Sequence, residues 1–327
     1  MKNKLISVLL VLALVFTACG AYGSAGTSEV SAADASKYLI KVNKQRNVVT
    51  VYMKKHGQYK PYRSMLCSTG GGNTPSGTHH LSYKFRWHTL MGPSWGQYCT
   101  VFCGDCLFHS VWYYQNHNKA VCSGAEYNRL GQSRSHGCIR LSVMDAKWIY
   151  ENCPGGTTVK IFRSSSTGPL GKPKGLKVSG TMAWDPTDPD PRNPDFRIKK
   201  PQIKMFGKNV RTAKKTVSYS KKKSVRLKTG IKAENINAYQ DLTDKVKIKK
   251  MFRKVNGKWK KISNRGHIRR KNSGKYKIIF SVHDKYCGGS SRAKLLLTIK
   301  EKPQPKPKPI PEPDPEQKQE QEQTEKI

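Results

Sequence analysis

Residues 133–140 place a cysteine, Cys138, directly behind a glycine in a turn-forming sequence. A nucleophilic cysteine reacts as its thiolate, so it needs a neighbouring base or electropositive surroundings and a backbone that leaves the sulfur accessible. Gly137 supplies the permissive backbone. The base has to come from elsewhere in the chain, and the best candidate is His109, which ends a short apolar run and precedes Ser110. We therefore predict a Cys138/His109 pair that performs nucleophilic chemistry.

Two further motifs accompany this pair. Residues 68–70 read Ser-Thr-Gly, and residues 73–78 read Asn-Thr-Pro-Ser-Gly-Thr. Together with His109-Ser110 and the Ser-His-Gly-Cys turn at 135–138, they resemble the YkuD-type L,D-transpeptidases. The resemblance covers about residues 37–165 and extends toward the Pro-rich segment 184–189. It implies a mainly β, sandwich-like or barrel-like catalytic domain with a short helix after the cysteine turn.

The resemblance also implies a role for each site residue. Cys138 would be the nucleophile and His109 the base that deprotonates it. Ser110 would orient or supplement the base, unless a neighbouring carbonyl does so, and backbone N–H groups near Cys138 would stabilise the oxyanion. Arg140 could bind a substrate carboxylate with both arms of its guanidinium. The supporting or substrate-positioning set is Ser110, Ser135, His136, Gly137 and Arg140; no cofactor and no metal is expected.

Similar enzymes act on peptidoglycan stem peptides. The thiolate would attack the carbonyl of the third residue of a tetrapeptide stem, release the terminal D-alanine and pass the acyl group to an amine of a neighbouring stem, which gives a 3→3 cross-link. Water as the acceptor would make the protein an L,D-carboxypeptidase, and the sequence leaves both open. A non-catalytic wall-binding surface protein is the other alternative. The Cys138 and His109 side chains argue against it, and the order of the two residues excludes a papain-like peptidase.

His109 and Cys138 lie 29 positions apart, which is longer than the interval usual in the family. We therefore expect an insertion over roughly residues 113–131 that loops out and acts as a lid. His117 lies in the same segment and is a rival for the base. His109 is preferred because it follows an apolar residue and precedes a serine, whereas the polar run 115–118 is typical of a loop tip.

The beginning of the chain reads as an export signal. Residues 1–36 hold two early lysines, an apolar run at 5–16 that is too short for a confident membrane span, and then small residues. Cys19 follows a sequence that resembles a lipobox, so it is a possible lipidation site, with cleavage between residues 21 and 33 as the alternative. We expect a secreted protein or a lipoprotein of the wall or the outer face of the membrane in a Gram-positive cell.

Hydrophobic alternation divides the remainder. Strands are expected at 38–42, 48–52 and 158–162 and a helix at 143–152, all within the catalytic domain 37–165. Residues 166–213 are rich in Pro and Gly and read as a tail and linker. Short strands resume at 214–300, where they predict a β-sandwich that resembles bacterial Ig-like domains. Residues 301–327 should be a disordered tail.

Charge points to an anionic partner. The chain has 61 Lys and Arg against 21 Asp and Glu, a formal net charge of +40. Export argues against nucleic acid, and the aromatic pattern of a nucleic-acid motif is missing from the sequence. We expect anionic wall polymers such as teichoic acids, attracted by long-range electrostatics. A merely solvated basic surface is the alternative.

The chain has nine cysteines, and seven remain to be explained beyond Cys19 and the nucleophile Cys138. Disulfides are plausible outside the cytoplasm, but their connectivity cannot be derived from the sequence. Cys99, Cys103 and Cys106 lie close together, with histidines upstream at 79, 80 and 88, yet their spacing fits no standard zinc module. Disulfides or buried thiols are therefore the preferred interpretation.

Overall fold

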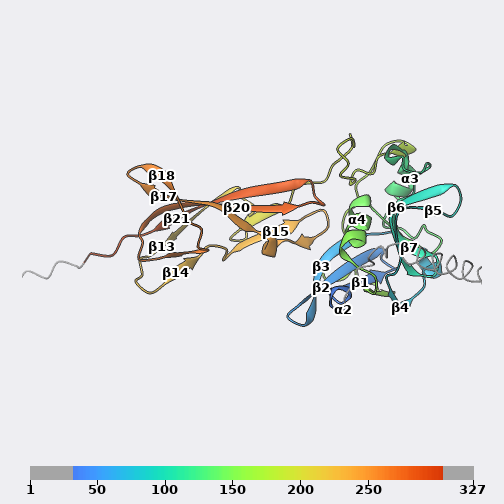
Figure 1. Ribbon diagram of the computed structural model, residues 1–327, viewed down its shortest axis with the longest axis horizontal. Helices are drawn as coiled ribbons and strands as arrows, with labels where there is room; N and C mark the ends of the chain where they lie inside the picture. The colour runs from blue at the N-terminus through green and yellow to red at the C-terminus, as the bar shows by residue number, and fades with distance from the viewer. Residues whose placement is uncertain (1–31, 305–327) are drawn as a thin grey trace, which may run out of the picture. The chain divides into compact units, whose positions relative to one another are not determined.

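The computed structural model describes residues 32–304, which form two compact units (Figure 1). Unit 1 contains the chain up to Lys200 together with 235–241 and 284–289, and unit 2 contains the rest. The expected export signal, Cys19 and most of the expected C-terminal tail lie outside the described residues. No helix among residues 32–304 is long and apolar enough to cross a membrane. The expectation of a mainly β chain is confirmed.

Unit 1 is built on two sheets. The first has five strands in the order β3-β2-β1-β10-β4, and the second has four in the order β5-β6-β7-β9. The pairing is antiparallel except for β1 with β10 and β7 with β9. The bounds are β1 Tyr38–Asn43, β2 Val48–Lys55, β3 Gln58–Leu66, β4 Gly77–His80, β5 Lys84–Leu90, β6 Ser94–Cys103, β7 Cys106–Ser110, β9 Ile139–Leu141 and β10 Thr158–Phe162.

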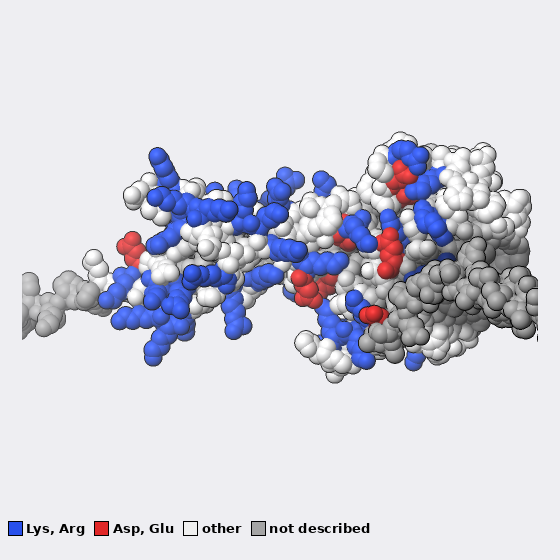
Figure 2. Space-filling model, in the orientation of Figure 1, with Lys and Arg blue, Asp and Glu red and all other residues white. Residues whose placement is uncertain are grey.

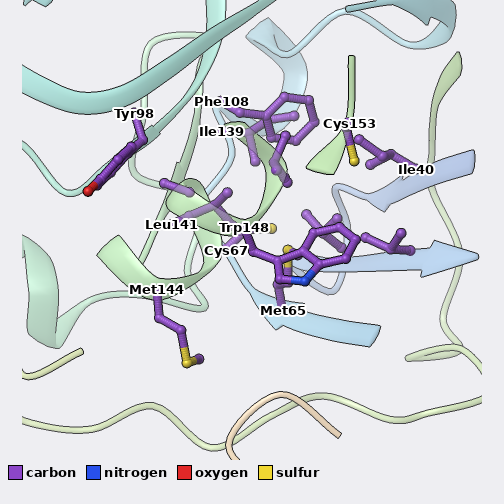
Figure 3. Packing of buried hydrophobic residues seen from close by; sticks show 14 of the residues in the cluster. Ile40, Met65, Cys67, Tyr98, Phe108, Ile139, Leu141, Met144, Trp148 and Cys153 are labelled. Carbon is purple, nitrogen blue, oxygen red and sulfur yellow. The ribbon is translucent and has the colours of Figure 1, made fainter. Parts of the chain in front are cut away.

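Helix α4, Val143–Asn152, fills the space between these sheets (Figure 1). Its Trp148 is 2% exposed and packs its ring edge against Tyr38 of β1 at a centroid distance of 5.2 Å. Figure 3 shows Trp148 with Phe108 of β7 and Ile139 of β9 among the buried side chains of this core. The helix follows the Cys138 turn and β9 directly, so core packing on α4 also fixes the end of β9.

The Pro-rich segment after residue 183 is an ordered part of unit 1. The Asp185 carboxylate accepts the Val143 N–H at 2.8 Å, and the Thr187 hydroxyl accepts the Met144 N–H at 3.0 Å. The Ser142 hydroxyl accepts the Asp145 N–H. These three acceptors satisfy the first N–H groups of α4, which have no partner within a helix.

Two later segments also belong to unit 1. Gln240 accepts a hydrogen bond from Arg63 at 2.7 Å, and the other arm of this buried guanidinium pairs with Asp145 of α4 at 2.6 Å. The Tyr286 hydroxyl contacts Asn152 and Glu151 at the end of the same helix. The division at Lys200 therefore differs from the expected one near residue 213, because these polar contacts were not readable from local composition.

Short elements complete unit 1. The expected looped-out insertion is instead partly packed, since Tyr113, Cys122 and Tyr127 are at most 3% exposed. Strand β8 in this segment pairs with β11, and Ser123 caps α3. The short elements are α2 Ala32–Ala35, β8 Cys122–Ser123, α3 Gly124–Asn128 and β11 Met182–Ala183.

Unit 2 has a core of its own. A five-stranded sheet in the order β13-β21-β20-β17-β18 packs its inner residues with those of β12, β15 and the small sheet β14-β19. Met251, Phe280 and Leu297 come from the large sheet, and Met205 and Ile268 from the smaller elements. Strands β12 and part of β13 lie in the segment expected to be a linker. The bounds are β12 Gln202–Met205, β13 Thr212–Val217, β14 Ser224–Arg226, β15 Ile231–Asn235, β17 Lys247–Val255, β18 Lys258–Ile262, β19 His267–Arg269, β20 Gly274–Asp284 and β21 Gly289–Ile299, whereas β16, Gln240–Asp241, belongs to the 235–241 segment of unit 1.

Candidate active site

Parallel pairing of β7 with β9 brings the two candidate residues to one face of a sheet. Phe108 pairs with Ile139 and His109 with Arg140. Phe108 and Ile139 are fully buried in the core, so alternation places His109 and Arg140 on the opposite face, together with Cys138 just before β9. This face borders a cavity of about 920 Å³ whose lining includes Cys138, His109 and Arg140.

The Cys138 turn is shaped by two glycines in contact. Gly137 has φ of +154°, a conformation that L side chains rarely adopt. A Cβ on Gly137 would lie 3.1 Å from the Cys106 sulfur, and one on Gly70 would lie 2.7 Å from the Gly137 nitrogen. The Ser-Thr-Gly motif at 68–70 thus allows the backbone of the cysteine turn to approach closely.

Hydrogen bonds fix this approach. The Thr74 hydroxyl donates to the Gly137 carbonyl at 2.9 Å and accepts the Gly70 N–H at 2.7 Å. Ser68 and Arg140 exchange two backbone hydrogen bonds, each 2.9 Å long. The Ser135 hydroxyl donates to the Cys138 carbonyl at 2.5 Å. These contacts join the three sequence motifs and fix the backbone that carries the Cys138 sulfur.

His109 is held as a neutral imidazole. Its Nδ1 lies 2.6 Å from the Ser110 carbonyl oxygen, and donation from this nitrogen leaves Nε2 as the acceptor. The side chain is 2% exposed, and burial, reinforced by the positive charge of Arg140, lowers its pKa to about 3. A Cβ on Gly96 would lie 3.2 Å from Nδ1, so that glycine leaves room for the ring.

Ser110 contacts the His109 ring through its carbonyl rather than its hydroxyl. The hydroxyl donates to the Val111 carbonyl at 2.8 Å and accepts the Gln97 N–H at 2.9 Å. It is therefore occupied in joining β7 to β6. Of the two possibilities that the sequence left open, the geometry favours the carbonyl as the group that orients the base.

The surroundings of Cys138 favour the protonated thiol. Its sulfur contacts the Asp105 carbonyl oxygen at 3.9 Å. Burial raises its pKa above the ordinary value of 9.0, although the Leu107 backbone and the Arg140 charge oppose this shift. The directions of the two pKa shifts favour a neutral thiol and a neutral imidazole over a thiolate–imidazolium pair.

Arg140 already has a partner. Its guanidinium donates to the Glu126 carboxylate of α3 at 2.5 Å, and both side chains are largely buried. Arg129 and Arg134 also approach Glu126, at 3.0 and 4.0 Å. We expected that Arg140 could bind a substrate carboxylate with both arms of its guanidinium. In the structure, Glu126 already occupies one of these arms.

The two other candidate histidines differ in their relation to the cavity. His117 is exposed on a turn with φ of +58°, against the Trp87 ring, and is not among the cavity residues. His136 is exposed in the cysteine turn and lines the cavity. Apolar residues that the sequence interpretation did not select also line it, among them Tyr83, Phe85, Met91, Trp112 and Tyr114.

The remaining cysteines are mostly part of the packing. Cys67, Cys99, Cys122 and Cys153 are buried free thiols, and burial raises the pKa of each. Within residues 32–304, no group of three or more His, Cys, Asp or Glu side chains is arranged to hold a metal ion.

Comparisons with known proteins concern unit 1. Residues 37–161 match the model of the YkuD family, the L,D-transpeptidase catalytic domain. The protein YciB of Bacillus subtilis (strain 168) is described as an inferred L,D-transpeptidase. It is 37% identical to this chain over 115 residues, and the match covers 33% of this chain and 58% of that protein. The chain thus spans less than two thirds of the length of this relative.

Solved structures match over a similar share. A fused Zn-dependent amidase/peptidase/peptidoglycan-binding domain-containing protein from Clostridium acetobutylicum ATCC 824 is 28% identical, with a TM-score of 0.30 and coverage of 38% of this chain and 52% of that one. An L,D-transpeptidase from Mycobacterium smegmatis is 21% identical, also with a TM-score of 0.30, and coverage is 39% and 59%. The family match therefore covers residues 37–161, the part of the chain that is similar to YkuD-type L,D-transpeptidase catalytic domains.

Proposed function

We propose that the chain is a peptidoglycan L,D-transpeptidase that works through a Cys138 acyl-enzyme. The observation that carries the proposal is the shared face of β7 and β9, where the His109 imidazole, oriented by the Ser110 carbonyl, and the Cys138 thiol border one cavity. His109 Nε2 takes the thiol proton as the sulfur attacks the carbonyl of the third stem residue. The protonated imidazole then gives this proton to the departing D-alanine amine.

The second half-reaction reverses these roles. An amine of a neighbouring stem attacks the thioester, His109 accepts its proton, and Cys138 leaves as the thiol, which gives a 3→3 cross-link. If water attacks instead, the protein is an L,D-carboxypeptidase.

The proposed activity can be tested with purified disaccharide-tetrapeptide. Mass spectrometry of the products should show one released alanine per cross-link and a dimer whose mass equals that of two monomers minus one alanine. Tripeptide without dimer would support the carboxypeptidase. Neither product from the wild-type protein would favour a non-catalytic wall-binding protein.

Unit 2 is proposed to be an Ig-like module that keeps the catalytic unit at the cell wall. Its alternating strands and separate core support a β-sandwich of this kind, and its Lys and Arg side chains favour anionic wall polymers such as teichoic acids. An export signal, with lipidation at Cys19 as one form of it, would place the protein outside the membrane. Detection of tryptic peptides of this protein in the cell-wall fraction of a Gram-positive cell would support this location.

A further inference from the structure

The large sheet of unit 2 has a hollow on its outer face. The hollow has a volume of about 710 Å³ and lies over β13, β17, β20 and β21. We define it as the basic groove. Its lining residues are Arg211, Thr212, Lys249, Lys250, Phe252, Lys277, Ile279, Arg292, Ala293 and Lys294.

Strand register explains how these side chains gather. Lys250 pairs with Ile279 and Phe252 with Lys277 across β17 and β20. On β13 and β21, Thr212 pairs with Lys294. The residues between them, such as Met251 and Ile278, are buried in the core, so alternation turns the groove residues outward. A register shift between Ile248 and Lys250 adds Lys249 to the same surface.

The charge of the groove is of one sign. Six of its ten lining residues are Lys or Arg, and these ten include no Asp or Glu. Lysines on adjacent strands repel each other, and an ordinary soluble surface intersperses both signs. Figure 2 shows Lys and Arg gathered over unit 2 with few acidic side chains beside them. A single-signed hollow is stabilised when an anion enters it.

The floor of the groove adds a second feature. Phe252 is partly buried there, and the Lys277 ammonium lies 4.7 Å from its ring centroid and 4.8 Å from that of Trp259. The two rings hold the Lys277 ammonium in place, and Phe252, with Ile279, gives the groove an apolar strip between charged rims. Such a strip suits the CH₂ and CH groups of a ligand whose charges are spaced along a chain.

We propose that the basic groove binds a linear phosphodiester polymer with an aliphatic backbone. Its phosphates would contact the lysines and the forked guanidiniums of Arg211 and Arg292, and its carbons would pass over Phe252. A hollow admits a chain more readily than a flat bilayer. This inference specifies the ligand surface behind the proposed wall attachment, and its failure would leave the catalytic proposal unaffected, because binding is measured without turnover.

Two matched triple variants of the full chain test the groove. One carries Lys249→Gln, Lys250→Gln and Lys294→Gln in the groove, and the control carries Lys221→Gln, Lys222→Gln and Lys228→Gln elsewhere in unit 2. All six side chains are exposed, and each variant loses three positive charges. The probe is purified poly(glycerol phosphate), with Kd measured by calorimetry at several salt concentrations.

The groove variant should bind at least tenfold more weakly and lose about two units of the slope of log K against log salt, since each neutralised phosphate contributes about 0.7 for a flexible strand. The control should change less than threefold. Equal losses in both variants would show that net charge alone binds the polymer and would overturn the proposal. Tighter binding of the wild type to phosphatidylglycerol vesicles or to single-stranded DNA, with the same groove dependence, would also overturn it in favour of that ligand.

Discussion

Gly70→Ala should disturb the Cys138 turn without touching a catalytic side chain. The new Cβ would lie 2.7 Å from the Gly137 nitrogen and 3.0 Å from its Cα, and both are backbone atoms. Ordinary contact begins at 3.4 Å, so the two segments must separate by 0.7 Å at this point. Thr74 bonds to both segments, so the shift also loosens the hydrogen bonds that fix the turn.

The magnitude follows from this displacement. A misplacement of about 1 Å can cost about 100-fold in rate, so 0.7 Å should slow acylation of Cys138 by roughly 10- to 100-fold. The strain should cost about 1–3 kcal/mol of the free energy of unfolding. The acylation rate is measured by intact-mass spectrometry with a carbapenem, and stability by urea unfolding.

Gly72→Ala is the matched control. It lies two positions away, and a Cβ there would meet nothing within 4 Å. This variant should acylate like the wild type. Wild-type acylation by Gly70→Ala, or an equal loss in both variants, would refute the role of the glycine contact in positioning the sulfur.

Three further predictions follow from the site. His109→Ala should slow acylation by about 100-fold or more, the usual scale for a general base, whereas His117→Ala should have little effect; a reversal would make His117 the base. Alkylation of Cys138 by iodoacetamide should accelerate about tenfold per pH unit from pH 6 to 9, because burial raises the thiol pKa above 9.0, and a plateau near neutral pH would instead reveal a stored thiolate. Glu126→Gln should lower the free energy of unfolding by about 1–3 kcal/mol, since it leaves Arg140 partly buried without its counter-charge, and an unchanged urea midpoint would contradict this.

The sequence was sufficient to predict those features that depend on the residue types within one short segment. The Gly137-Cys138 turn and the apolar-His-Ser pattern at His109 were sufficient to select Cys138 and His109, which both border the cavity. The helix at 143–152 was visible because its start combines a capping serine with apolar spacing. The match of residues 37–161 confirms the family resemblance.

Long-range contacts could not be predicted in the same way. Glu126 pairs with Arg140 only because α3 folds back onto β9, and local patterning says nothing of such a return. The Pro-rich segment at Asp185 looked like a spacer, yet its carboxylate caps α4. Gln240 contacts Arg63, which lies 177 positions earlier in the chain, and residues 235–241 therefore belong to unit 1.

The central claim is an acyl-enzyme on Cys138, and peptide mapping after incubation with a carbapenem tests it most directly. The account predicts a single covalent adduct on the peptide that contains Cys138 in the wild-type protein, and none in a folded Cys138→Ala variant. An adduct on another cysteine, such as Cys106 at the same cavity, or an adduct that persists in Cys138→Ala, would contradict the account.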